Sequence, residues 1–261
     1  MKRGLCIALH GGDHKTGVTM LSQCIAEHMT EHLEEQTVIQ VGLHGNPGGD
    51  YTSVSVRTVE ELRSYLEQNL FNAGEILRDC KVTDRQYLVR GITRPEQQRL
   101  YHPKLAQYLV EQLREQSQYV VADTGSEADN GLAIGGLQAA DIRCLVLTQQ
   151  ESVIARWERN QSIYRRLGID FQMLIVNRYL PESAYTKEYL AERLEFPADR
   201  ILTVSDSPYG LKADNEKKSL IQYKDERIRQ GIRGICQRLT EHCGVDYPEE
   251  KRWKRWKKGF I

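Results

Sequence analysis

Short apolar runs alternate with amphipathic segments along most of this 261-residue chain. The apolar runs are rich in β-branched residues and lie at residues 5–9, 37–41, 87–91, 119–123, 142–147, 171–177 and 201–204. The segments between them that predict helices are 18–29, 59–69, 103–113, 152–167 and 224–243. Continuous apolar strands separated by helices are typical of a parallel sheet covered on both faces. The pattern therefore predicts an α/β fold, a doubly wound and mostly parallel sheet with helices on both faces.

No linker rich in Pro, Gly or Ser and no internal repeat divides the chain. We therefore expect one α/β domain over residues 1–245, followed by a separate tail over residues 246–261. Hydrophobic residues make up 40% of the chain and charged residues 28%, which is typical of an ordinary globular protein. No apolar run approaches the roughly 18 residues that a membrane-spanning helix needs.

The six cysteines are scattered, and none forms a CxxC pair. Most of them fall in apolar segments, which favours reduced cysteines in a cytosolic protein and argues against a zinc site. The apolar run that follows Met1-Lys2-Arg3 is too short for a signal peptide. We therefore expect a cytoplasmic protein.

A glycine-rich segment, Gly11–Leu21, joins the first apolar run to the first helical pattern. Its spacing, Gly12-x-x-x-x-Gly17-x-Thr19, is that of a phosphate-binding P-loop, but Val18 stands where a P-loop has lysine. Backbone N–H groups at a helix N-terminus can hold phosphate without a side chain. The alternative is a strand-to-helix turn that binds nothing. The predicted phosphate-binding residues are Gly12, Asp13, His14, Lys15, Thr16, Gly17, Val18, Thr19 and Met20.

Polar residues end two further predicted strands, where parallel sheets bind their ligands. Asp123 ends one run and Asn177 ends another. Thr19 could ligate Mg²⁺, and Asp123 could hold that ion through water. The amide of Asn177 could read the edge of a base. Alternatively, Asp123 caps the next turn and Asn177 bonds its own backbone. Their joint placement favours a nucleotide site, with ATP and Mg²⁺ as the expected ligands.

From about residue 4 to 243, these motifs resemble the ParA/MinD group of P-loop ATPases. Residues 12–19 are similar to that group's deviant Walker A motif, G-K-G-G-x-G-K-T, and residues 119–125 are similar to its Walker B strand. Residues 140–152 resemble its A-D-x-v-l-V…S segment. Val176-Asn177-Arg178 resembles the motif whose asparagine contacts adenine, so the resemblance adds Arg178 to the predicted nucleotide site. It also implies a P-loop NTPase-like fold and a homodimer.

Residues 91–96 resemble one branch of that group, TadZ/CpaE, whose members help to place pilus and secretion machines at the membrane. The P-loop is degenerate, however, because Val18 replaces the catalytic lysine and Asp13 replaces the signature lysine. Gly42-Leu43-His44 replaces the segment that supplies the water-activating acid. Because phosphoryl transfer depends on positioning and on cations, these losses should slow it on the order of a thousandfold or more. Lys15 lies in the loop but at a different position. We expect nucleotide binding to survive and hydrolysis to be weak or lost.

The last residues form a basic, aromatic tail. Residues 251–261 hold six Lys or Arg and no acid, whereas residues 1–250 hold 30 basic and 36 acidic side chains. Drawn as a helix, the tail has aromatic residues on one face and basic residues on the other, which is typical of a helix in an anionic membrane interface. The predicted membrane-binding residues are Trp253, Trp256, Lys257, Lys258, Phe260 and Ile261. Nucleic-acid binding and a solvated tail are the alternatives.

The tail also resembles the amphipathic segment that ends MinD-like proteins. We therefore expect a dimeric spatial regulator or scaffold, peripheral on the inner face of the cell membrane, that serves a pilus or secretion machine. The alternative is an active ParA/MinD-type ATPase in positioning or DNA partition.

Overall fold

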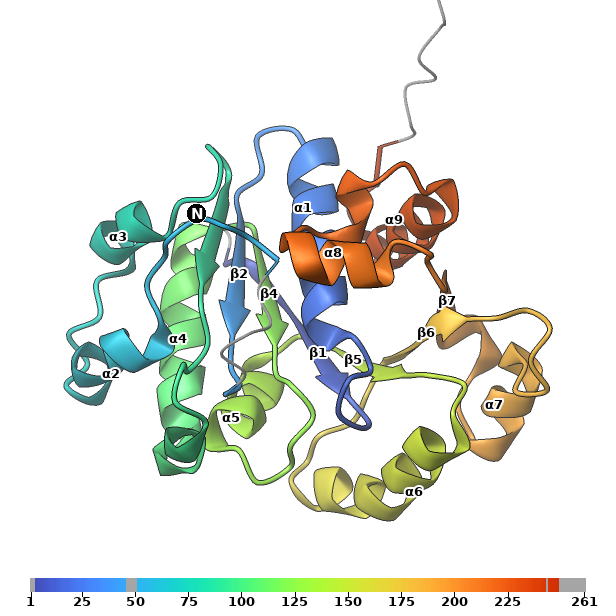
Figure 1. Cartoon of the computed structure of the whole chain (residues 1–261). Helices are drawn as coiled ribbons and strands as arrows, with labels where there is room; N and C mark the ends of the chain where they lie inside the picture. Colours follow the sequence, from blue (N-terminus) through green and yellow to red (C-terminus); the bar gives the residue numbers. More distant parts are fainter. Residues whose placement is uncertain (1–2, 46–50, 243, 249–261) are drawn as a thin grey trace, which may run out of the picture.

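Seven parallel strands form the centre of the molecule in the computed structural model, which describes residues 3–45, 51–242 and 244–248 (Figure 1). The strands are β1 (Leu5–Gly11), β2 (Val38–Gly42), β3 (Gln86–Val89), β4 (Tyr119–Asp123), β5 (Ile142–Leu147), β6 (Met173–Tyr179) and β7 (Ile201–Ser205). They lie in the order β3-β2-β4-β1-β5-β6-β7, and every neighbouring pair is parallel. The predicted α/β fold is confirmed.

Helices cover both faces of this sheet, as the continuous apolar strands require. They are α1 (Val18–His32), α2 (Val59–Glu67), α3 (Ala73–Ile76), α4 (Pro103–Gln116), α5 (Gly131–Ala139), α6 (Glu151–Arg166), α7 (Lys187–Arg193), α8 (Gly210–Glu216) and α9 (Glu226–Glu241). Short 3-10 turns are η1 (Leu77–Cys80), η2 (Pro95–Leu100), η3 (Ala198–Arg200) and η4 (Leu220–Gln222). Within the described ranges, no helix has the length and apolar character that crossing a membrane demands.

Strand β1 shows how the sheet divides the core in two. Ile7 and Leu9 pack with α1 and α9 on one face, whereas Cys6 and Ala8 pack with α4 and α6 on the other. All four side chains are fully buried. Strand β1 therefore has no polar face, and its central place puts the glycine-rich segment that follows it in the middle of the sheet's carboxyl edge.

The described chain ends near the far end of α1. Tyr247, which lies in the predicted tail, is 8% exposed and packs in the core shared by α1 and α9. Its hydroxyl donates to the carbonyl of His28 at 3.1 Å. His28 is near the end of α1 opposite the glycine-rich segment. The predicted membrane-binding residues of 253–261 lie outside the described residues.

Candidate functional site

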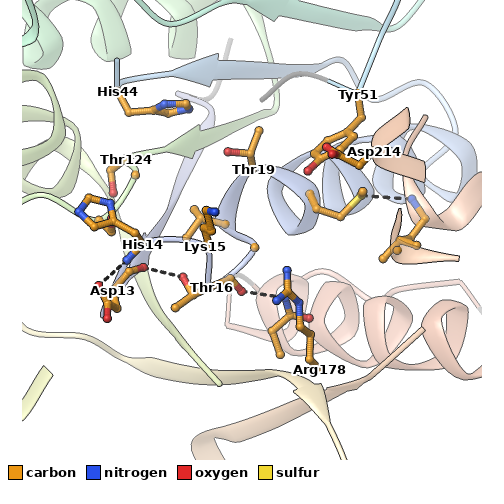
Figure 2. A pocket seen from close by; sticks show the side chains of 18 of the residues that line it. Asp13, His14, Lys15, Thr16, Thr19, His44, Tyr51, Thr124, Arg178 and Asp214 are labelled. Carbon is orange, nitrogen blue, oxygen red and sulfur yellow. Dashed lines mark hydrogen bonds between the residues drawn. The ribbon is translucent and has the colours of Figure 1, made fainter. Parts of the chain in front are cut away.

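A cavity of about 930 Å³ opens at the carboxyl edge of the sheet (Figure 2). Its walls come from the loop between β1 and α1, from the segments that follow β2 and β4, and from the ends of β6 and β7 with α8. This edge is where parallel α/β sheets bind ligands. The structure thus brings the glycine-rich loop, His44, Asn177 and Arg178 together around one space.

The loop has the backbone shape that a phosphate cradle needs. Gly17 has a φ of +90° and Lys15 a φ of +59°, so both adopt the left-handed conformation. Glycine adopts it freely, but for lysine it costs roughly 1 kcal/mol. Lys15 stands where the resembled motif has glycine, so the chain keeps the loop's shape while placing a cation in it. Figure 2 shows Lys15 between His14 and Thr19 at the centre of the cavity.

The start of α1 faces this loop without a side-chain cap. The N–H of Leu21 donates to the carbonyl of Gly17 at 3.0 Å and opens the helical ladder. The N–H groups of Val18, Thr19 and Met20 come before that ladder, and all three residues line the cavity. Unsatisfied N–H groups and the positive end of the helix dipole favour an anion here.

The Val18 side chain supplies no charge to the cavity. It is 6% exposed and belongs to the core under α1. The cations that line the cavity nearby are Lys15 and Arg178, both exposed, and neither forms an ion pair with any described residue. Positive charge is therefore available in the cavity, but from other positions than in the resembled motif.

Asp13, at the signature-lysine position, is held within its own chain. Its Oδ1 lies 3.1 Å from Nε of Arg156 on α6 and accepts the N–H of His14 at 2.7 Å. The ring of His14 contacts the hydroxyl of Ser126 at 3.1 Å. These contacts link the loop to α6 and to the segment after β4.

Asn177 fixes the loop against β6. It is 7% exposed, and its Nδ2 donates to the carbonyl of Thr16 at 2.8 Å. A Cβ on Gly17 would lie 2.4 Å from this nitrogen, so the close approach requires glycine. The amide predicted to read a base therefore donates one of its two N–H groups to the loop, although Asn177 still lines the cavity.

Asp123 is buried behind the cavity, with a close contact at each carboxylate oxygen. It is 1% exposed; its Oδ1 accepts the N–H of Gly125 at 2.9 Å, and its Oδ2 lies 2.9 Å from Nε2 of His44. Burial alone would raise the pKa of Asp123, but the charge and the hydrogen bond of His44 oppose it. With smaller contributions from the hydroxyl of Thr19 and from Gly125, the net effect is a lowered pKa.

The predicted magnesium ligands, Thr19 and Asp123, do not fit that ion in this arrangement. Magnesium requires an octahedral shell of oxygens at about 2.0–2.1 Å. The carboxylate of Asp123 instead contacts the imidazole of His44 and accepts the N–H of Gly125. No group of three or more His, Cys, Asp or Glu side chains in the described part of the chain could hold a metal ion.

The sequence reasoning missed one wall of the cavity, formed by Tyr51 and by the segment after β7. Tyr51 exchanges two hydrogen bonds with Gln23 of α1, of 3.0 and 3.2 Å. Burial, with a smaller contribution from the charge of Asp214, raises the pKa of Tyr51 to about 12. Figure 2 shows the side chains of Tyr51 and Asp214 beside each other. Ser205, Asp206 and Ser207 lie at the carboxyl end of β7. The strand-end rule that selected Asp123 would have selected them too.

Comparison with known proteins adds to this geometry. No family model and no curated protein matches the sequence. A ParA family ATPase from Chlorobium tepidum matches the structure with a TM-score of 0.78 at 13% identity, covering 92% of this chain and 100% of its own. Aquifex aeolicus MinD, in its complex with MinC, gives 0.72 at 16% identity, with coverages of 95% and 99%. MinD from Pyrococcus horikoshii, complexed with Mg-ADP, gives 0.72 at 15% identity, with coverages of 92% and 98%.

The fold is a P-loop NTPase-like α/β fold. More narrowly, the chain has the fold of the ParA/MinD ATPases, over nearly its whole length and theirs.

Proposed function

We propose that this protein binds ATP or ADP in the cavity and acts as a ParA/MinD-type spatial regulator or scaffold whose ATP hydrolysis is weak or lost. The observation that carries the proposal is the uncapped start of α1, where the N–H groups of Val18, Thr19 and Met20 lie at the cavity wall. Lys15 and Arg178 add positive charge. A P. horikoshii protein of the same fold is complexed with Mg-ADP.

The loss of hydrolysis follows from three positions. Val18 is buried in the core, Asp13 is paired with Arg156, and His44 stands where the water-activating acid is expected. The site therefore lacks two cations that would meet the developing charge and the acid that would orient water. A thousandfold loss of rate corresponds to about 4 kcal/mol of transition-state stabilisation.

Calorimetric titration with ATP and with ADP, beside a turnover assay, tests both parts of this proposal. We expect saturable one-site binding and a turnover no higher than the protein-free blank. Lys15→Ala should weaken binding, whereas Lys104→Ala removes an exposed lysine outside the cavity and should leave it unchanged. Absence of binding would refute the proposed site.

The sequence also suggests which partners this protein would have. The tail at residues 251–261 would bind an anionic membrane surface, two copies would act together as a dimer, and the TadZ/CpaE-like segment would link the protein to a pilus or secretion machine on the cytoplasmic side. Deleting residues 251–261 should abolish co-sedimentation with vesicles that contain an anionic lipid. Replacing Trp253, Trp256 and Phe260 by Ser keeps the charge, so vesicle binding should weaken while any nucleic-acid attraction through phosphate persists.

An active ATPase is the second candidate, favoured by the cations that remain in the cavity at Lys15 and Arg178. It predicts measurable turnover that Asp123→Ala abolishes and that a lipid or protein partner stimulates.

If hydrolysis has been lost as first proposed, the double substitution Val18→Lys and His44→Asp should raise ATP turnover above that of the protein-free blank. Val245→Lys, which changes a valine that is 41% exposed, is the control for the added charge.

A further inference from the structure

The contact between His44 and Asp123 is the feature of the cavity that the proposed function does not use. Asp123 ends β4 and His44 follows β2, and these strands are neighbours in the sheet. Nε2 of His44 lies 2.9 Å from Oδ2 of Asp123, and the two side chains are 12% and 1% exposed. The pair therefore closes the floor of the cavity where the Walker B acid of the resembled motif would meet a metal.

The backbone on both sides holds His44 in this position. The N–H of Leu43 donates to the carbonyl of Asp123 at 2.7 Å, and the N–H of Ile92 donates to the carbonyl of His44 at 3.0 Å. Gly125 packs so closely that a Cβ there would lie 2.9 Å from the Cβ of His44. Gly125 also has a φ of +61°, which favours glycine. The histidine is therefore fixed beside the carboxylate by two separate segments, the one after β4 and the one that holds Ile92.

We propose that His44 takes the place of the divalent metal at this site, so that the cavity binds its nucleotide in the metal-free form. The inference rests on the proposed function, that the cavity binds ATP or ADP. A cation reached by Asp123, directly or through water, would have to displace the imidazole of His44, because Nε2 of His44 lies 2.9 Å from Oδ2 and Oδ1 already accepts the N–H of Gly125. The described residues also offer no group of three His, Cys, Asp or Glu side chains that could hold the ion without the nucleotide.

Other groups meet the phosphate charge in this arrangement. The start of α1 provides N–H donors, and Lys15 and Arg178 line the same cavity without ion pairs to described residues. These groups act on phosphate oxygens directly and need no metal bridge. Phosphoryl transfer uses both a metal and the lysine that Val18 replaces. A site that has lost this lysine is therefore consistent with one that binds phosphate without a metal.

ATP titrations in excess EDTA and in excess Mg²⁺ test the inference, together with Mn²⁺ alone followed by electron paramagnetic resonance. We expect ATP affinities that agree within about twofold in the two buffers and no Mn²⁺ bound by the wild-type chain. An affinity that falls tenfold or more in EDTA, or a Mn²⁺ site that Asp123→Asn removes, would overturn the inference and leave the proposed function standing. If ATP binds in neither buffer, the proposed function fails, and the Mn²⁺ measurement alone decides the metal question.

His44→Ala should expose Asp123 to metal. In this variant we expect one bound Mn²⁺ and a melting temperature that rises on addition of Mg²⁺, changes that the wild type lacks. His242→Ala, which removes an exposed histidine at the end of α9, is the matched control and should behave as the wild type. If His44→Ala does not fold, His44→Asn keeps a hydrogen-bond donor beside Asp123, and the wild-type titrations remain decisive. A folded His44→Ala that binds no Mn²⁺ would contradict the inference.

Discussion

Replacing Gly17 by Ala should damage the cavity in a way that the structure quantifies. The φ of +90° at this residue costs an L-residue roughly 1 kcal/mol. The new Cβ would lie 2.4 Å from Nδ2 of Asn177, so that amide must move and give up its bond to Thr16, at about 1 kcal/mol more. We therefore expect the free energy of unfolding to fall by about 2 kcal/mol and ATP affinity to fall at least tenfold.

Gly168→Ala is the matched control for this change. Gly168 has a φ of +69°, but nothing lies within 4 Å of a Cβ built there. It follows α6 and lies outside the cavity lining. Only the backbone cost of roughly 1 kcal/mol applies, and ATP binding should not change. Urea unfolding and calorimetry measure both quantities. Equal losses of stability in the two variants, with ATP affinity kept in Gly17→Ala, would refute the role of Asn177 as the loop's clamp.

Three further predictions concern stability. His10 is fully buried between Thr124 and Tyr164, and burial lowers its pKa to about 4. In the unfolded chain the histidine takes up its proton at a higher pH than in the folded protein, so the free energy of unfolding should fall by up to roughly 3 kcal/mol as the pH drops from about 6.5 towards 4. Urea unfolding across that range measures this fall, and the variant His10→Gln should flatten the pH dependence. Arg114→Met should cost about 3 kcal/mol, because the buried guanidinium bonds Asp141 at 2.6 Å and the carbonyl of Gly4 at 2.7 Å; a loss below 1 kcal/mol would contradict this. Arg156→Ala should change the unfolding free energy by less than about 1 kcal/mol, because its partly exposed pair with Asp13 is a surface ion pair.

The strand pattern was enough to predict the sheet, because parallel strands that are buried on both faces must be apolar throughout. The predicted strand at 171–177 begins instead at Met173. Phe171 does not pair in the sheet but packs its ring 5.3 Å from that of Trp157 and 5.8 Å from that of Tyr164. Because Phe171 is apolar, it extends the apolar run in the sequence, and the pattern alone predicts a longer strand.

Helix α5 shows what periodicity misses. Its nine residues include three glycines and no polar face, so neither propensity nor spacing marks a helix there. Two of the glycines are required by the start of α4 and the residues just before it: a Cβ on Gly131 would lie 1.9 Å from the carbonyl oxygen of Tyr101, and one on Gly135 would lie 2.0 Å from that of Pro103. Such a close approach between helices depends on tertiary structure that the sequence pattern does not carry.

The site was predictable in its parts but not in its contacts. Strand ends and loop spacing selected the residues from Gly12 to Met20 and also Asn177. The contact of His44 with Asp123 depends on β2 and β4 being neighbours, and the pairing of Asp13 with Arg156 depends on the position of α6. The first of these contacts is the reason why Thr19 and Asp123 do not fit the predicted magnesium ion in this arrangement.

Equilibrium dialysis against radiolabelled ATP, with the recovered nucleotide identified afterwards, measures nucleotide binding and hydrolysis in one experiment. We expect the protein chamber to retain about one equivalent of nucleotide, and we expect this nucleotide still to be ATP after prolonged incubation. Recovery of ADP and phosphate above the protein-free blank, or no nucleotide retained at all, would contradict this expectation.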